Sequence, residues 1–254
     1  MNTEPTAGIR KKDRAMSTRL SRGDTGPFED AHNKANKGKG KETATLLPLR
    51  PIRVVTMEVP IEEVSPLITH KWSHKMLESI RIKKEGGVKR PREKLDADAE
   101  YREAAYLDNK GRHCMPAIAF KKAILTAAAI EREASGARNL SRKYVAGTIF
   151  VLGDLIPIEY DKVERREDPV RVGMGSADLR YRPMYTGWRA TLVVQFNESL
   201  IGAEQVISLI NSAGFAVGVG EWRPEKGGGQ FGRWQVAAGT KIKASNGHSR
   251  QRGN

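Results

Sequence analysis

The chain has 254 residues, which is enough for one large domain or two small ones. Its 44 lysines and arginines and 30 acidic residues give a net charge of +14, which favours a polyanionic partner, most commonly nucleic acid; lysine-rich tails are the alternative source of this excess. The single cysteine, Cys114, excludes an internal disulfide, and the lack of a membrane-spanning apolar run or a signal segment predicts a soluble, cytoplasmic protein.

The two ends of the chain differ in composition from its middle. Residues 1–45 contain ten lysines or arginines, six acidic residues and few large apolar side chains, so they predict a disordered basic arm. Residues 239–254 contain four lysines or arginines and no acid, and they predict a basic C-terminal tail. The domain expected between them, residues 46–238, keeps a charge of about +6 and is therefore basic in its own right.

The first half of this domain predicts a strand and two helices, separated by a polar insertion. Residues 51–59 alternate and are rich in β-branched side chains, so they predict a strand. Residues 66–84 carry apolar side chains near helical spacing and predict a helix in part, within an insertion of about 63–112 whose later, strongly polar part predicts a loop or finger. Residues 116–130 predict the best helix of the chain, because proline suits a first turn and alanine, leucine and lysine favour the interior.

The second half predicts strands on both sides of a second insertion and of a second helix. Residues 144–160 predict one or two strands, and the polar residues 161–187 predict an insertion. Residues 188–197 alternate cleanly and predict a strand, and a helix is expected over 203–212, ending at Gly214. The last strands are expected at 215–219 and 230–237.

This order of elements, β-α-β-β-α-β with two long insertions, predicts an α+β, ferredoxin-like (RRM-like) fold that ends in a glycine-rich hairpin. Such a fold has a four-stranded antiparallel sheet with its helices on one face. Binding is expected on the open face of the sheet and on the insertions.

The glycine-rich segment 218–234 (GVGEWRPEKGGGQFGRW) combines glycines, cations and aromatic rings. Glycine lets the backbone approach a partner closely, cations bind phosphates and rings stack on bases, so the segment favours a single-stranded nucleic acid over a small metabolite. The alternative is that the glycines only form a tight turn or bulge, with Trp222 and Trp234 in the core. The binding residues expected here are Gly220, Trp222, Arg223, Lys226, Phe231 and Arg233.

A ferredoxin-like body whose last helix is followed by such a loop resembles the repeat-associated (RAMP) superfamily of CRISPR proteins, over about residues 47–238. The long excursion after the first strand looks more like the backbone subunits of Cascade-type effectors than like the crRNA-processing endoribonucleases. The resemblance implies that copies assemble side by side along a guide RNA, with the insertions as fingers and a thumb. The chain also looks like small stand-alone phage proteins, which implies a prokaryotic or phage-infected cell and a role in antiviral defence or in phage nucleic-acid handling.

Two further groups of residues are candidate contacts to nucleic acid. Basic residues of the first insertion suit phosphates, although a charge run is more simply a solvated face. In the second insertion, a tyrosine between two arginines alternates along an extended segment, which gives one stacking face and one phosphate face; packing on a neighbouring copy is the alternative. The expected residues are Lys71, Trp72, Lys75, Lys89, Arg90 and Arg92 in the first insertion and Arg180, Tyr181 and Arg182 in the second.

Histidines and the cysteine are candidate ligands or catalysts. His70 and His74 share a helix face if the helix has begun by then, and His113 adjoins Cys114, but no CxxC or HExxH spacing occurs, so no metal or cofactor is expected. His70 or His113 as general base toward an RNA 2′-hydroxyl is the enzymatic alternative, a metal-independent RAMP endoribonuclease. The acidic residues of 161–168 lie among arginines, which favours ion pairs over a two-metal nuclease, and no Walker or Rossmann sequence is present.

The leading interpretation is a non-enzymatic RAMP-like protein that binds single-stranded RNA or DNA and assembles in multiple copies, as a homo-oligomeric filament, along the strand. Other effector-complex subunits are further expected partners, and a membrane is not. A phage assembly or anti-defence interaction protein, docked by its basic arm, is the third alternative.

Overall fold

A computed structural model describes residues 52–86, 96–137, 140–172, 176–239 and 244–246. The chain divides into two units, Met1–Leu49 and Arg50–Asn254, and all described residues belong to the second. The predicted basic arm therefore lies outside the described residues, and so do Lys89, Arg90 and Arg92 of the first insertion.

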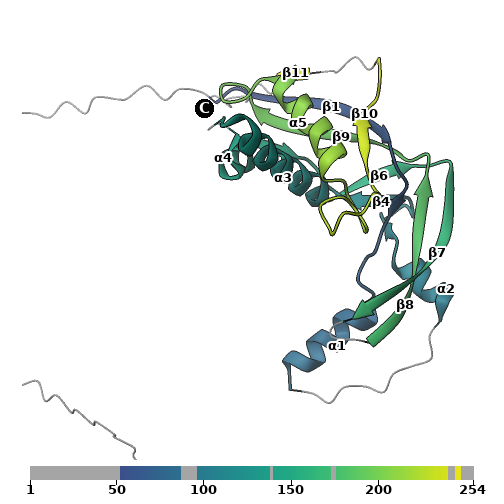
Figure 1. The fold of residues 1–254 in the computed structure, drawn as a ribbon. Helices are drawn as coiled ribbons and strands as arrows, with labels where there is room; N and C mark the ends of the chain where they lie inside the picture. Colours follow the sequence, from purple (N-terminus) through teal and green to yellow (C-terminus); the bar gives the residue numbers. More distant parts are fainter. Residues whose placement is uncertain (1–51, 87–95, 138–139, 173–175, 240–243, 247–254) are drawn as a thin grey trace, which may run out of the picture. The chain divides into compact units, whose positions relative to one another are not determined.

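The core is an antiparallel sheet whose strands follow the ferredoxin-like order (Figure 1). β1 (Val54–Glu63) lies in the centre and pairs with β10 (Trp234–Val236) on one side and with β9 (Arg189–Asn197) on the other. β9 pairs in turn with β5 (Ile149–Val151) and β6 (Leu155–Glu159), which together take one strand position. The spatial order is thus fourth, first, third, second, and each of these pairings is antiparallel, as a β-α-β-β-α-β unit requires.

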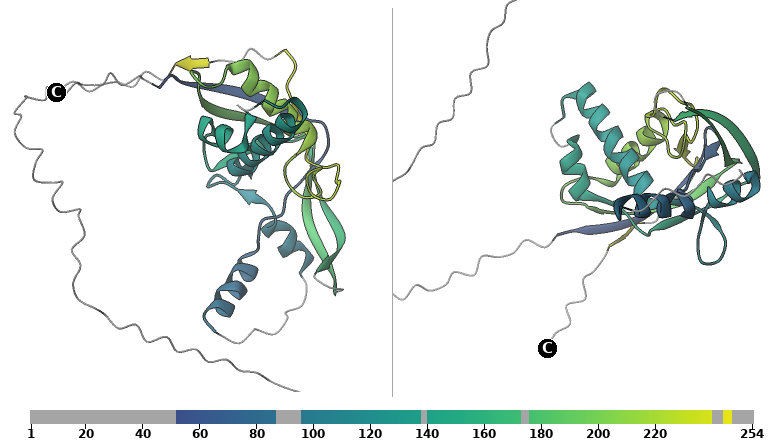
Figure 2. Two further views of the ribbon diagram at one scale, coloured as in Figure 1. Left: turned by 60° about the vertical axis from the view of Figure 1, so that its left-hand side comes forward. Right: turned by 90° about the horizontal axis from the view of Figure 1, so that it is seen from below.

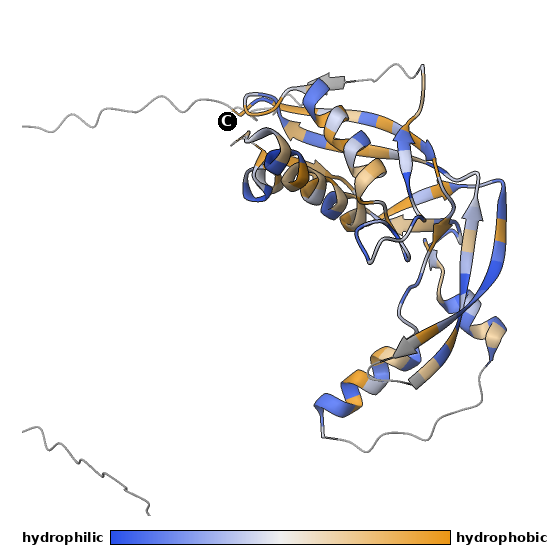
Figure 3. Cartoon of the chain, viewed as in Figure 1, coloured by the Kyte–Doolittle hydropathy of each residue, from blue (hydrophilic) through white to orange (hydrophobic). Residues whose placement is uncertain are grey.

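Two helices connect these strands and cover one face of the sheet (Figures 1 and 2). α3 (Ala117–Ser135) precedes β5, α5 (Ala203–Ala216) joins β9 to β10, and the two helices pack against each other. The alternation of apolar and polar residues along β1 and β9, visible in Figure 3, buries Leu192 and Val194 of β9 completely. Burying such side chains stabilises the fold by about 1.5–3 kcal/mol each. The predicted α+β, ferredoxin-like class is confirmed.

Helix α5 continues past Gly214, where the sequence predicts its end, and terminates at Ala216. A Cβ atom at Gly214 would lie 2.1 Å from the carbonyl oxygen of Trp234, so the missing side chain lets the helix pack closely against β10. The prediction of a capping glycine and of a strand at 215–219 is wrong, because this glycine serves close packing and not a left-handed cap. The returning strand is limited to β10.

Helix α4 (Arg142–Thr148) occupies the first part of the stretch 144–160, which the sequence predicts as strand. The hydroxyl of Ser141 accepts a hydrogen bond from the amide of Tyr144 at 3.2 Å, which is the geometry of an N-cap. The two predicted strands follow as β5 and β6, on either side of the turn at Gly153.

The first insertion holds more structure than a loop. β2 (Leu67–Ile68) is followed by α1 (His74–Lys84), which confirms part of the predicted helix. Three further elements lead into α3, and the last of them, β4, pairs with β3 and with β6 and so extends the central sheet. These elements are α2 (Ala97–Glu103), β3 (Tyr106–Leu107) and β4 (His113–Pro116).

The second insertion is a β-hairpin. β7 (Lys162–Val172) and β8 (Ser176–Thr186) pair along their whole length, and β8 also pairs with β2. Charged residues occupy so many positions in β7 that the apolar alternation of a half-buried strand is lost from its sequence. A further short strand, β11 (Ala244–Asn246), pairs with β1 inside the segment predicted as the C-terminal tail.

Candidate nucleic-acid interface

The glycine-rich loop between α5 and β10 is fixed by its backbone to the residues around β2. The amide of Glu221 donates to the carbonyl of Ile68 at 2.9 Å, and the amide of Gly232 donates to that of Pro66 at 2.7 Å. A Cβ atom at Gly220 would lie 2.3 Å from the Ile68 carbonyl oxygen. Gly220 therefore serves close backbone approach inside the protein, where the sequence predicts approach to a ligand.

Trp222 is held in a strained conformation by this loop. Its φ of +53° is the only positive value for a non-glycine residue in the described part of the chain. The Trp222 carbonyl accepts a hydrogen bond from the Phe231 amide at 3.0 Å, and a Cβ atom at Gly229 would lie 1.8 Å from that carbonyl oxygen. The side chain nevertheless remains 43% exposed. Trp234 differs, since it is buried and packs edge-on against Phe120 with ring centroids 5.5 Å apart. The alternative that both tryptophans belong to the core therefore holds for Trp234 and not for Trp222.

The three cations of the loop have different environments. The Arg223 guanidinium donates to Glu225 at 2.8 and 3.0 Å and to the Gly220 carbonyl at 2.9 Å, so it braces the loop. Arg233 donates to the Phe215 carbonyl at 3.2 Å and lies 4.8 Å from the centroid of the Phe215 ring, at the end of α5. Lys226 is exposed. Only Lys226 therefore offers the loop's positive charge freely to solvent in the way the sequence predicts.

Arg182 joins the β7–β8 hairpin to the glycine-rich loop. Its side chain is 1% exposed, and its guanidinium lies 2.6 Å from the buried carboxylate of Asp168 and 3.8 Å from that of Glu221. Arg166 also pairs with Asp168, at 2.8 Å, and lies 4.8 Å from the centroid of the Phe231 ring. The prediction that Arg182 contacts nucleic acid needs correction, because a buried and paired guanidinium has no phosphate within reach.

Arg180 and Tyr181 confirm the predicted alternation along the strand. Both lie in β8, where successive side chains point to opposite faces, so Tyr181 and Arg180 face different sides of the hairpin. The Arg165 guanidinium lies 5.7 Å from the Tyr181 ring centroid and pairs with Asp98 of α2. Arg180 is half-buried and close enough to His70 to influence its charge.

The predicted residues at the start of α1 lie at the surface. Lys71, Trp72 and Lys75 are all exposed, and Trp72 leaves 56% of its area in solvent. The hydroxyl of Ser73 accepts a hydrogen bond from the Met76 amide at 3.2 Å and so begins the helix. None of the residues of α1 is buried, although the helix carries several apolar side chains.

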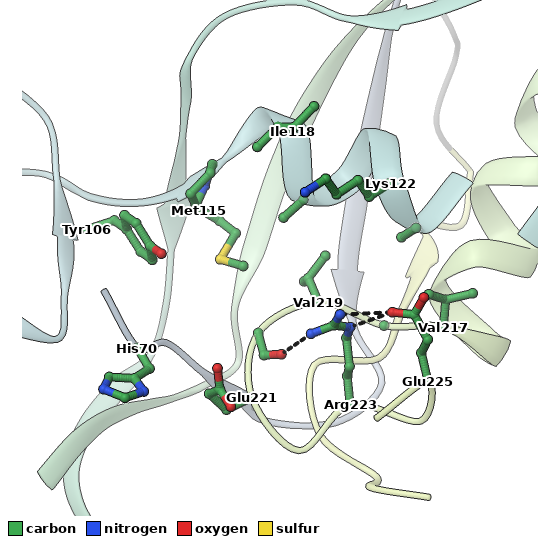
Figure 4. Close-up of a pocket in the computed structure, with 15 residues that line it drawn as sticks. His70, Tyr106, Met115, Ile118, Lys122, Val217, Val219, Glu221, Arg223 and Glu225 are labelled. Atoms are coloured by element: carbon green, nitrogen blue, oxygen red, sulfur yellow. Dashed lines mark hydrogen bonds and ion pairs between the residues drawn. The ribbon is translucent and has the colours of Figure 1, made fainter. Parts of the chain in front are cut away.

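A pocket of about 240 Å³ lies beside the loop (Figure 4). Its lining comes from five parts of the chain, represented by His70, Tyr106, Met115, Lys122 and Glu221. Burial and the nearby Arg180 lower the pKa of His70, while Glu221 acts in the opposite direction. Burial, with a smaller contribution from Glu221, raises the pKa of Tyr106. Tyr106, Lys122 and Glu221 are not among the site residues that the sequence predicts, because no motif links residues that only the tertiary structure brings together.

His113 and Cys114 are the first two residues of β4 and do not belong to the pocket lining. The His113 Nδ1 atom and the Tyr185 hydroxyl are 2.8 Å apart, and the His113 ring packs edge-on against Tyr160 and Tyr185. Burial lowers the pKa of His113. The described residues contain no group of three histidine, cysteine or acidic side chains placed to hold a metal ion. Within the same residues, no helix combines the length and apolar character that crossing a membrane requires.

No protein-family model matches the chain, and no curated protein matches it in sequence. Several solved structures are similar to it in fold, including the following two. One is type III-B Cmr-beta bound to cognate target RNA, with a TM-score of 0.39 and 7% identity; the match covers 76% of this chain, which spans 61% of the length of the other. The second is Cmr6 from Pyrococcus furiosus, with a TM-score of 0.35 and 11% identity, over 72% of this chain and 99% of that one.

Proposed function

We propose that this protein binds single-stranded nucleic acid, a guide RNA or single-stranded DNA, without cleaving it, as a RAMP-like backbone subunit. The observation that carries the proposal is that Trp222 combines a positive φ with an exposed side chain. A bulky residue at positive φ costs about 1–3 kcal/mol, and such strain is typical of functional positions. Here it holds an indole that remains 43% exposed, and base stacking is a use for an exposed aromatic face on a basic protein.

Cations of the loop and of the hairpin support a phosphate-binding surface. Lys226 follows Trp222 on the same loop, and both Lys226 and Arg180 are near enough to His70 to act on its charge. Lys71 and Lys75 flank exposed Trp72 at the start of α1, and both side chains face solvent. Phosphate contacts by these residues would supply most of the affinity, with stacking on the indoles adding to it.

The apolar side chains of α1 support assembly in several copies. Met76, Leu77 and Ile80 are 45%, 46% and 37% exposed, and α1 contains no buried residue. A helix of 11 residues is marginally stable alone, since helices of this length depend on the packing of an apolar face. A second copy of the chain, placed next along the strand, would cover this face.

The experiment is an anisotropy titration of labelled single-stranded RNA and DNA. Trp222→Ala is expected to weaken binding about fivefold to a hundredfold, because stacking contributes about 1–3 kcal/mol per base, and Trp222→Phe is expected to keep most of the affinity. Phe215→Ala is the matched control, since Phe215 is 70% exposed but lies at the end of α5. Affinity of the wild type should fall steeply with salt. Salt-insensitive binding, or equal affinities for Trp222→Ala and Phe215→Ala, would contradict the proposal.

A metal-independent endoribonuclease is the second candidate, and His70 is the observation that favours it. Burial and Arg180 lower the pKa of His70, so its ring is neutral at pH 7 and able to accept a proton, beside a pocket that also holds Tyr106. Labelled RNA incubated with wild type, His70→Ala and His113→Ala separates the two functions. If the wild type cleaves the RNA and His70→Ala does not, the result supports the endoribonuclease. If no protein forms product, or if all three form equal amounts, the result rejects it.

A further inference from the structure

The pocket beside the glycine-rich loop has apolar walls and a few polar groups. Met115 of β4, Ile118 of α3 and Val219 of the loop supply apolar surface, and Figure 4 shows the Tyr106 hydroxyl and the Glu221 carboxylate directed toward the same space. At about 240 Å³ it is smaller than the clefts of about 300–1,000 Å³ that hold drug-sized ligands. A ligand that fits this volume, with apolar faces against the apolar walls and polar edges near the polar groups, has the size of a single heterocycle.

The charges of the pocket favour a neutral group inside and a phosphate outside. Glu221 and Glu225 both line the pocket, and Arg223 neutralises Glu225, whereas the pair of Glu221 with Arg182 is long, at 3.8 Å. Two acidic side chains, Glu221 and Glu225, balance two basic ones, Lys122 and Arg223, so the lining carries no net positive charge to hold a phosphate inside, and Glu221 would repel it. An N–H group of a nucleobase would instead donate a hydrogen bond to that carboxylate.

The neighbouring polar groups are in the states that such a ligand needs. Burial and Glu221 raise the pKa of Tyr106, so its hydroxyl stays protonated and able to donate to a base carbonyl or ring nitrogen. Burial and Arg180 keep His70 neutral at pH 7, so its ring offers both a donor and an acceptor. Lys122, also in the lining, contributes an exposed ammonium.

The pocket lies next to the exposed indole along the loop. Glu221 of the pocket lining directly precedes Trp222, and Arg180 and Lys226 are near enough to His70 of the lining to act on its charge. A strand stacked on Trp222 would therefore lie one residue along the loop from the pocket lining. We propose, on the basis of the proposed function above, that the pocket receives one unstacked nucleobase of the bound strand, with an N–H edge on Glu221.

A pair of alanine substitutions on one helix tests this proposal. Ala119 lines the pocket and Ala129 does not, and both are half-buried residues of α3. The probe is a single-stranded oligonucleotide with one 2-aminopurine, placed at each position in turn, whose fluorescence rises when the base leaves the stack. Wild type and Ala129→Leu are expected to raise the fluorescence at one position. Ala119→Leu, which fills the pocket, is expected to abolish the rise and to weaken binding about tenfold, with the salt dependence unchanged because the phosphate contacts remain.

A second variant guards against a packing artefact in the first. Tyr106→Phe removes only the hydroxyl that faces the pocket, and about a threefold to tenfold loss of affinity is expected from the lost hydrogen bond. Equal fluorescence and affinity for Ala119→Leu, Tyr106→Phe and wild type would overturn the inference. So would a free nucleoside monophosphate that binds the pocket tightly while no strand position responds, because the pocket would then be a nucleotide site. If the wild type binds no strand, the proposed function itself fails, and the inference fails with it.

Discussion

Gly214 decides how α5 meets β10. The backbone of Trp234 takes the space of its absent side chain, and the Trp234 carbonyl oxygen would lie 2.1 Å from an added Cβ atom. Because that neighbour is backbone, it cannot move aside as a flexible side chain would. Residue 214 therefore acts as a packing position in the last turn of α5, although glycine within a helix otherwise weakens it.

Gly214→Ala is expected to lower the free energy of unfolding by about 1–3 kcal/mol, because overpacking forces the helix away from the strand. Gly147→Ala in α4 is the matched control, since an added Cβ atom there meets nothing within 4 Å. The control should leave stability unchanged or raise it by up to about 1 kcal/mol through better helix propensity. Urea unfolding of both variants measures the difference, and equal stabilities would refute the packing role.

Residue roles in the loop were predictable only in part. Glycines, cations and aromatics in one segment indicate an unusual loop, and an exposed Trp222 agrees with that indication. The sequence does not reveal that Arg223 pairs with Glu225 or that Arg182 is buried. A charged side chain is expected to be exposed unless its partners are known. The partners of Arg182 are Asp168 of β7 and Glu221 of the glycine-rich loop, which only the tertiary structure brings close to it.

At the level of elements, a buried ion pair between Asp168 of β7 and Arg182 of β8 joins the two strands of the hairpin, and Arg182 also lies 3.8 Å from Glu221 of the glycine-rich loop. Asp168→Asn removes the close charge partner of the buried Arg182 guanidinium and leaves only the Glu221 carboxylate at 3.8 Å, so the free energy of unfolding should fall by about 3–5 kcal/mol. Replacing both residues with leucine should recover most of this loss, since apolar pairs of similar volume are often as stable as a buried ion pair. Arg165→Gln, which removes an exposed pair with Asp98 from the same hairpin, should cost less than about 1 kcal/mol. Thermal or urea unfolding checks all three, and a fall no larger than that of Arg165→Gln would contradict a structural role.

A second prediction at the level of elements concerns the exposed apolar face of α1. Met76→Glu combined with Ile80→Glu places charge on the face proposed to meet a second copy, so association should weaken by at least about tenfold. Ile52→Glu is the control, because Ile52 is 71% exposed and precedes β1. Sedimentation velocity with and without a single-stranded oligonucleotide measures the effect. Unchanged assembly in the α1 variant would assign the contact to another surface.

Strands and helices of the core were predictable because their apolar residues follow the periods of 2 and 3.6. The same rule fails for β7, whose residues are largely charged, and for β4, which has only four residues. It also fails for α4, which shares its apolar residues with the strand that follows. Sequence patterns miss those elements whose conformation depends mainly on contacts with neighbouring elements and not on an apolar periodicity of their own.

For the whole molecule, the distribution of charge separates the proposed function from docking by the basic arm. The net charge is +14, and about +6 remains when both ends are removed. Deleting residues 1–45 should therefore leave most of the affinity for single-stranded nucleic acid, with a smaller dependence on salt because fewer phosphates are neutralised. Loss of all binding in this variant, measured by the same anisotropy titration, would favour an interaction protein that docks by its arm.

The position of β7 at the end of its sheet has a consequence for handling the protein at high concentration. Among the described strands, β7 pairs only with β8, so one row of its backbone groups has no neighbouring strand. Such edges invite sheet extension by other chains and thereby aggregation, which charged side chains and proline counteract. β7 carries both, with Lys162, Glu164 and Arg165 early in the strand and Pro169 later. The charges that conceal this strand in the sequence thus protect the molecule from uncontrolled edge-to-edge polymerisation.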